Sequence, residues 1–163
     1  EVYLTDTIAV AAKMGKARAV QHPDFTEVQG VNDRWELTLA RQTLQRRILK
    51  AHAQQGVDFL QPDTVIVGVD VQIGSDVTIG PSVVLYGVTQ IGRGTTIGAF
   101  CHLVDADIGE GVSIHSHSVC ESALVEKDAS IGPYARLRPD SRVCTGARVG
   151  NFVEMKKSCW ICF

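Results

Sequence analysis

Large apolar residues recur every six residues along the second half of the chain. The register slips by one residue after Leu103 and again after Cys120. An amphipathic helix cannot give this period, because its apolar stripe repeats every 3.6 residues. The Asn-Gly and Asp-Gly pairs that close short hairpins are absent. The sixteen repeated positions are Val67, Ile73, Ile79, Leu85, Ile91, Ile97, Leu103, Ile108, Ile114, Cys120, Val125, Ile131, Leu137, Val143, Val149 and Met155.

A second, smaller residue precedes each large one by two positions, beginning with Val65 and ending with Val153. Glycine follows the large residue in eight of the sixteen repeats, where we expect it to provide unusual backbone angles at a corner. The pattern predicts a triangular prism in which three hexapeptides form a coil of about 18 residues and coils stack about 4.8 Å apart through parallel strands. From about Val65 to Lys157 this gives about five coils, with the large residues buried inside.

The first third of the chain has a different pattern. Residues 4–16 have the spacing of a helix, and residues 17–20 favour a strand. Asn32 is expected to cap a long helix that runs to about Gln55, because apolar residues from Leu37 to Ala51 recur at spacings of three and four.

Gly56 then ends this helix. Residues 58–63 are expected to lead the chain onto the prism. The fold class is therefore mainly β, a parallel β-helix preceded by helical segments.

Composition argues against some classes of function. The formal net charge is −2, which argues against a general nucleic-acid binder. No run of 18 apolar residues indicates a membrane span. The five cysteines are odd in number and irregularly spaced, so we expect free thiols in a reducing compartment. The chain begins at Glu1 within its pattern, and we expect it to be a segment of a longer polypeptide.

Basic residues gather in the last two coils. Between Lys127 and Lys157 there are seven basic residues and three acidic ones. Scattered charges usually form a solvated surface. Arg138 and Lys156, however, both occupy the slot after a large apolar residue and are one coil apart. Two stacked cations favour an anion between them, and arginine offers a bidentate fork to a phosphate.

Two other motifs contain residues that could bind a metal or take part in redox chemistry. His102, His115 and His117 invite comparison with the metal site of hexapeptide-fold carbonic anhydrases, but their spacing favours surface histidines. Cys159 and Cys162 have the spacing of a redox motif, but the βαβ context that this motif requires is missing.

Four segments resemble a known family: residues 1–6 (EVYLTD), 27–34 (EVQGVNDR), 131–139 (IGPYARLRP) and 149–157 (VGNFVEMKK). They are similar, in order and spacing, to the bacterial bifunctional enzymes that combine N-acetylglucosamine-1-phosphate uridyltransferase and glucosamine-1-phosphate acetyltransferase. The resemblance implies a left-handed β-helix over residues 57–163. It also implies a linker helix over 32–56 and the C-terminal end of the nucleotidyltransferase domain over 1–31.

The resemblance further implies two reactions in the bacterial cytoplasm. Acetyl-CoA acetylates glucosamine-1-phosphate at the β-helix, and UTP with Mg²⁺ then converts N-acetylglucosamine-1-phosphate into UDP-N-acetylglucosamine for peptidoglycan and lipopolysaccharide. The partners implied are these small molecules and two further copies of the chain, because the β-helices form a homotrimer with acetyl-transfer sites between subunits.

By position, the resemblance makes Arg138 and Lys156 binders of the sugar phosphate. It makes Asn32 a ligand of Mg²⁺ and of the UDP-sugar, and it places Glu1, Tyr3 and Thr5 in the wall of the uridyltransferase pocket.

The family's glycine-rich nucleotide loop, the aspartate that shares Mg²⁺ and the general-base histidine have no counterpart in the chain. Residues 159–163 depart from the hexapeptide pattern. We therefore expect the isolated chain to catalyse neither reaction. Two alternatives are a non-catalytic trimeric scaffold and another hexapeptide acyltransferase.

Overall fold

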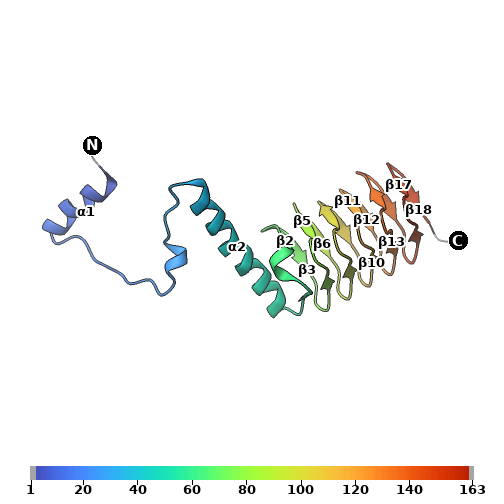
Figure 1. The fold of residues 1–163 in the computed structure, drawn as a ribbon, viewed down its shortest axis with the longest axis horizontal. Coiled ribbons are helices and arrows are strands. Elements are labelled where there is room, and N and C mark those ends of the chain that lie inside the picture. The colour runs from blue at the N-terminus through green and yellow to red at the C-terminus, as the bar shows by residue number, and fades with distance from the viewer. Residues whose placement is uncertain (1–2, 162–163) are drawn as a thin grey trace. The chain divides into compact units, whose positions relative to one another are not determined.

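The computed structural model describes residues 3–161, which divide into two compact units. The first unit comprises Glu1–Arg41 and the second Gln42–Phe163. Figure 1 shows both units and labels some of their helices and strands. Each unit is described by itself.

The first unit contains α1 (Leu4–Lys13), the short 3-10 helix η1 (Phe25–Glu27) and the start of α2 (Arg34–Gln54). Helix α1 ends three residues earlier than the sequence predicted, and Gly15 follows it with a left-handed φ of 67°. The predicted strand over residues 17–20 is wrong. This segment is irregular, because a strand needs a hydrogen-bonding neighbour and none of the described residues pairs with it.

Asp33, rather than Asn32, caps the N-terminus of α2. Its Oδ1 accepts a hydrogen bond from the backbone N–H of Glu36 at 2.8 Å. The Glu36 carboxylate in turn accepts the backbone N–H of Asn32 at 2.6 Å. The first bond satisfies an N–H group that the helix leaves unpaired, and the second ties the residue before the cap to the first turn of α2.

The second unit is a solenoid of three parallel sheets (Figure 1). Successive strands enter the sheets in turn, so each sheet takes every third strand. Sheet A consists of β1 (Asp58–Phe59), β4 (Thr78–Ile79), β7 (Thr96–Ile97), β10 (Ser113–Ile114), β13 (Ser130–Ile131) and β16 (Arg148–Val149). Sheet B consists of β2 (Ile66–Val67), β5 (Val84–Tyr86), β8 (His102–Val104), β11 (Val119–Glu121), β14 (Arg136–Leu137) and β17 (Glu154–Met155). Sheet C consists of β3 (Gln72–Ile73), β6 (Gln90–Ile91), β9 (Asp107–Ile108), β12 (Leu124–Val125), β15 (Arg142–Val143) and β18 (Cys159–Trp160).

The predicted β-helix is confirmed, and it is longer by one strand at each end. Strand β1 already pairs with β4, within the segment expected only to lead onto the prism, and a second 3-10 helix, η2 (Pro62–Thr64), follows it. Strand β18 pairs with β15, so the expected departure from the pattern after residue 158 is wrong for Cys159 and Trp160. The step from Met155 to Trp160 is five residues, the same slip that carries Leu103 to Ile108 between sheets B and C.

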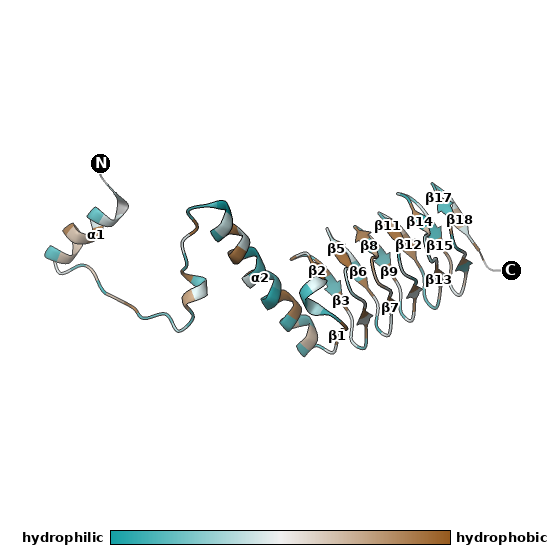
Figure 2. Ribbon diagram, viewed as in Figure 1, coloured by the Kyte–Doolittle hydropathy of each residue, from teal (hydrophilic) through white to brown (hydrophobic). Residues whose placement is uncertain are grey.

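The core of the solenoid is the column of large apolar residues. All sixteen predicted positions are buried, and the least buried of them, Ile73, is only 7% exposed. Fifteen of the sixteen smaller positions are buried too, Val153 being the exception. Figure 2 shows the resulting alternation of hydrophobic and hydrophilic residues along the strands. At the N-terminal end, Ile48 and Leu49 of α2 pack into the same core as Val57 and Phe59.

Residues with left-handed backbone angles form the three edges of the prism. Each edge stacks one such residue per coil, and non-glycine residues fill most of these places. The columns are Asp76, Gly94, Gly111, Asp128 and Gly146; Ser82, Phe100, His117, Tyr134 and Phe152; and Gly87, Asp105, Ser122, Asp140 and Lys157.

The expected role of glycine after the large residue is therefore wrong. Of those eight glycines only Gly132 has a positive φ. Five of the others lie where the backbone of the next coil comes too close for a Cβ: Gly74, Gly80, Gly92, Gly98 and Gly109. A Cβ on Gly92 would lie 2.5 Å from the backbone nitrogen of Glu110, and one on Gly74 would lie 2.8 Å from that of Arg93.

Replacing Gly92 with alanine should therefore destabilise the solenoid, because the added methyl group meets rigid backbone of the next coil. We expect a loss of about 1–3 kcal/mol, as for an overpacked core. Gly150→Ala is the matched control, since a Cβ there meets nothing within 4 Å. Chemical denaturation of the two variants tests this. Equal stability of the two would contradict the close-approach explanation.

Candidate functional site

Arg138 and Lys156 stack on adjacent coils of sheet B. Leu137 pairs with Met155 across β14 and β17, and the backbone N–H of Arg138 donates to the carbonyl of Met155 at 3.0 Å. The predicted stacking of these two residues is therefore confirmed. Arg138 is half-buried and Lys156 is exposed. Their role in binding stays a prediction.

The charge around this pair is more balanced than the sequence analysis assumed. Nη1 of Arg138 lies 3.5 Å from Oε1 of Glu154, which belongs to the neighbouring coil. Arg136 forms a similar pair with Glu121, at 3.2 Å. Arg138 therefore already has an anionic neighbour. Within residues 3–161, Lys156 forms no ion pair within 4.0 Å, so its ammonium group is the less compensated cation.

A side chain in this slot is not itself unusual. Along this edge of sheet B only the first coil has glycine, Gly68, in the slot after the large residue. The later coils carry Tyr86, Val104, Glu121, Arg138 and Lys156. This position of sheet B thus accommodates side chains of many kinds. The last two coils differ from the others because both carry a cation there, Arg138 and Lys156.

The residues predicted for the nucleotide site lie in the first unit. Glu1 lies outside the described residues. The backbone N–H of Tyr3 donates to Oδ2 of Asp6 at 2.8 Å, and the side chain of Tyr3 is exposed. Thr5 is exposed in the first turn of α1. Asn32 precedes α2, where its Nδ2 donates to Oε2 of Glu36 at 3.1 Å.

The side-chain amide oxygen of Asn32 is a suitable ligand for Mg²⁺, because this ion prefers oxygen ligands in octahedral geometry. Its amide nitrogen is bonded to Glu36, so the hydrogen bond fixes which end of the amide carries the free oxygen. However, within residues 3–161 no three His, Cys, Asp or Glu side chains gather as they would around a metal ion. The amide oxygen of Asn32 would be one ligand of such an ion.

An exposed ladder of stacked rings is a feature that the sequence analysis missed. Phe100, His117, Tyr134 and Phe152 stack along one edge, with centroid separations of 4.9, 4.7 and 5.2 Å. His117 lies between two rings, whereas Nε2 of His115 is 3.2 Å from Oγ of Ser130. The ladder's spacing of 17 or 18 residues is the signal by which the sequence could have revealed it.

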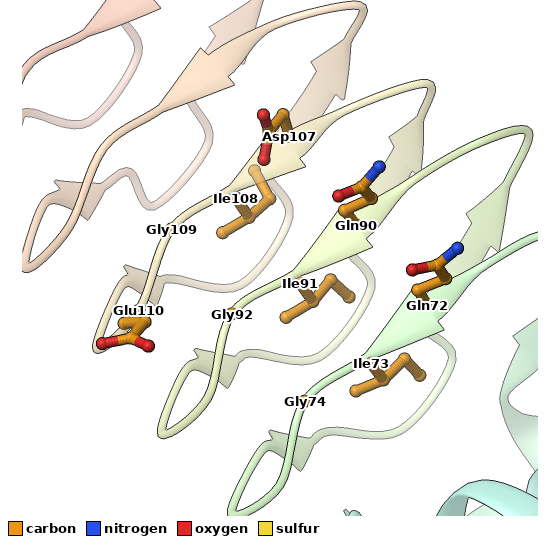
Figure 3. Close-up of a pocket in the computed structure, with 10 residues that line it drawn as sticks. All are labelled: Gln72, Ile73, Gly74, Gln90, Ile91, Gly92, Asp107, Ile108, Gly109 and Glu110. Carbon is orange, nitrogen blue, oxygen red and sulfur yellow. The ribbon is translucent and has the colours of Figure 1, made fainter.

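Sheet C carries a shallow hollow away from the two cations. Figure 3 shows Gln72, Gln90 and Asp107 following one another on successive strands, beside the glycines Gly92 and Gly109. The hollow crosses β3, β6 and β9, whereas Arg138 and Lys156 follow strands β14 and β17 of sheet B. It is therefore separate from the candidate phosphate site.

Glu126 is the centre of a charged cluster on sheet C. Its carboxylate accepts hydrogen bonds from the guanidinium of Arg142 and, at 2.9 Å, from both the backbone N–H and the hydroxyl of Thr145. The bond from Arg142 is the main reason that the pKa of Glu126 is lowered, and the two bonds from Thr145 add to it. These bonds favour the charged form of the carboxyl group.

The fold defines a hexapeptide-repeat β-helix protein. Residues 70–105 match the family model described as bacterial transferase hexapeptide (six repeats).

Over 159 residues, 97% of its length, the chain is 43% identical to the bifunctional protein GlmU of Lactobacillus helveticus and to that of Enterococcus faecalis. The identity to the GlmU of Pseudoalteromonas atlantica is 41%. The resemblance seen in the sequence is thus confirmed: the chain is homologous to proteins named bifunctional protein GlmU. It spans about a third of the length of these relatives.

Among solved structures there is a distant likeness to the acetyltransferase domain of PglB from Neisseria gonorrhoeae. The TM-score is 0.38 at 15% identity, covering 71% of this chain and 58% of that one. Within residues 3–161, no helix has the length and apolar character needed to cross a membrane.

Removing the guanidinium of Arg142 should raise the pKa of Glu126 towards its ordinary value. Because the folded-state pKa is lowered, the stability from this cluster is present above the pKa of the unfolded chain and is lost as the pH falls through the folded-state value. The stability gap between wild type and Arg142→Ala should therefore be widest near neutral pH and narrow on acidification.

NMR titration of the Glu126 carboxyl group, with melts at several pH values, measures both effects. Arg93→Ala is the control, because Arg93 pairs with Asp76 at 3.4 Å and not with Glu126. An unchanged titration of Glu126 in Arg142→Ala would show that this bond does not set the pKa.

Proposed function

We propose that the chain is a segment of a bifunctional enzyme that makes UDP-N-acetylglucosamine in the bacterial cytoplasm. Residues 57–163 belong to its β-helical acetyltransferase domain, residues 32–56 to a linker helix and residues 1–31 to the end of its uridyltransferase domain. The homology to proteins named bifunctional protein GlmU over 97% of the chain is the observation that carries the proposal.

In the acetyltransferase reaction, Arg138 and Lys156 hold the phosphate of glucosamine-1-phosphate. Their positions on adjacent coils support this role, because equivalent positions in stacked strands are about 4.8 Å apart and one phosphate can contact both. The guanidinium of Arg138 presents paired N–H donors, and the ammonium of Lys156 adds a compact charge. The ion pair with Glu154 orients the guanidinium of Arg138 when no phosphate is bound.

The phosphate contacts orient the sugar so that its amine attacks the thioester carbonyl of acetyl-CoA, the C–S bond breaks and coenzyme A leaves as its thiolate. The amine must lose a proton during this step, and the base that accepts it comes from a region outside this chain. The β-helix assembles as a homotrimer, so that each acetyl-transfer site receives residues from neighbouring subunits.

In the uridyltransferase reaction, the amide oxygen of Asn32 would help to hold the UDP-sugar and Mg²⁺, and the ion would supply neutralisation of phosphate charge. Its hydrogen bond to Glu36 orients the amide for this contact. Glu1, Tyr3 and Thr5 contribute to the wall of the pocket. The loop that holds the UTP phosphates lies in a part of the enzyme that this chain does not contain.

A chimaera tests the acetyltransferase role. This chain replaces the matching region of the Lactobacillus helveticus relative, and we expect the product to acetylate glucosamine-1-phosphate. Arg138→Ala or Lys156→Ala in the chimaera should lower kcat/KM for the sugar phosphate about ten-fold or more, because each removes a charge-assisted hydrogen bond worth about 1.5–3 kcal/mol.

Arg93→Ala is the matched control, since it removes an exposed arginine from a distant coil. A thermal melt of each variant separates lost binding from lost folding. Unchanged kinetics for both cation variants would refute the phosphate site, and a non-catalytic scaffold would leave the chimaera without acetyltransferase activity.

The isolated chain should catalyse neither reaction. Asn32 alone does not assemble a magnesium site, and Arg138 and Lys156 bind the phosphate without supplying the base. Coenzyme A release in the presence of acetyl-CoA and glucosamine-1-phosphate, and UDP-N-acetylglucosamine formation from UTP, measure the two activities. Turnover of either by the purified 163-residue chain would contradict this expectation.

A further inference from the structure

Two thiols lie side by side on the outer face of sheet C. Strand β18 pairs with β15 so that Cys159 is opposite Arg142 and Trp160 opposite Val143. Cys144 directly follows β15, and its Sγ lies 3.4 Å from the Sγ of Cys159. Both cysteines are free. The solenoid therefore brings together two residues that are 15 apart in the sequence.

The other two described cysteines have no such access. Cys101 and Cys120 are buried in the core, and burial raises the pKa of their thiols to about 11 and about 12. A thiol reacts as its thiolate, so these two are expected to be inert. Cys159, by contrast, is exposed, and Cys144 is half-buried.

Arg142 is opposite Cys159 across β15 and β18, and it is two residues before Cys144. Its pKa is raised chiefly by Glu126, and the charged forms of Cys144 and Cys159 contribute as well. A cation near a thiol stabilises the thiolate. The pKa of Cys144 is raised, mainly by its hydrogen bond with Cys159. Because Cys159 is the more exposed of the two thiols, it is the better placed to meet an oxidant first.

We propose that Cys144 and Cys159 are a thiol pair that oxidises reversibly to a disulfide and so fastens β18 to β15. The oxidant is an organic disulfide such as glutathione disulfide. The thiolate of Cys159 attacks one glutathione sulfur, so that the glutathione S–S bond breaks and one glutathione thiolate leaves.

The thiolate of Cys144 then attacks Sγ of Cys159 in this mixed disulfide. The Cys144–Cys159 bond forms, and the second glutathione leaves with the electron pair of the bond that breaks. The two protons lost by the cysteines pass to the two glutathione thiolates. The protein pair is thus oxidised by two electrons and glutathione disulfide is reduced to two thiols.

The position of β18 means that a disulfide there would restrict the movement of this strand. Among residues 3–161 it is the last strand of sheet C, and it pairs there with β15 alone. Backbone hydrogen bonds from Arg142 to Ser158 and from Cys144 to Trp160, both 2.9 Å, hold it to the solenoid. Trp160, although placed inward opposite Val143, remains 42% exposed. Bond formation requires the sulfurs to close from 3.4 Å to about 2.05 Å, a movement that an edge strand allows.

The test uses the reduced 163-residue chain, incubated with glutathione disulfide, alkylated and mapped by peptide mass spectrometry. We expect a Cys144–Cys159 cross-link, loss of two hydrogen atoms from the monomer, and reversal by dithiothreitol. Hydrogen exchange of the Arg142 and Cys144 amides, which bond to β18, should slow by about ten-fold or more on oxidation, because closing a short loop removes open states of the strand.

Cys144→Ser and Cys159→Ser should each abolish the cross-link and the slowing of exchange. Cys162→Ser is the matched control and should retain both. Any of four results would overturn the proposal. These are glutathione adducts without a cross-link, a disulfide to Cys162, a disulfide between two chains, and thiols that stay reduced. Unchanged exchange of the two amides in cross-linked protein would also overturn it, since β18 would then not be fastened.

Discussion

Parallel hydrogen bonding between consecutive coils is the interaction on which this structure depends. Each strand is too short to be stable alone, and its backbone groups find partners only in the coils before and after it. Gly98 donates to the carbonyl of Ile114 at 2.7 Å, and Ser113 donates to that of Ala129 at 2.9 Å. The buried column follows the same rule, because each inward side chain packs on its equivalents in adjacent coils. Stability therefore comes from contacts between neighbouring coils.

The same stacking organises the outer surface. Equivalent side chains on successive coils are close enough to interact, so charges and rings pair between coils. The contacts Arg136–Glu121, Arg138–Glu154 and Arg142–Glu126 all join residues one coil apart. The aromatic ladder and the thiol pair obey the same geometry. A binding or reactive site on a solenoid of this kind therefore forms where suitable side chains occupy equivalent positions on two successive coils.

The two ends of the solenoid are covered differently. At the N-terminal end, Leu49 of α2 packs into the core and excludes water from the first coil. At the other end of residues 3–161, β18 pairs with β15 alone, and Trp160 is only partly covered. The proposed phosphate site and the proposed disulfide both belong to these last coils. Their side chains project from different sheets, so the two proposals are independent of each other.

The β-helix can be predicted from the amino-acid pattern alone, because a six-residue apolar period has one common structural solution. The pattern also predicts that residues such as Ile79 and Leu137 are buried and that Arg138 and Lys156 succeed one another, since one coil is 18 residues at that point. Tertiary structure decided what depends on contacts between coils. Examples are the close approach at Gly92, the ion pair of Arg138 with Glu154, the strand formed by Cys159 and Trp160, and the contact of Cys159 with Cys144. A repeat period specifies which positions are equivalent, but distances between side chains on adjacent coils follow only from the path of the folded backbone.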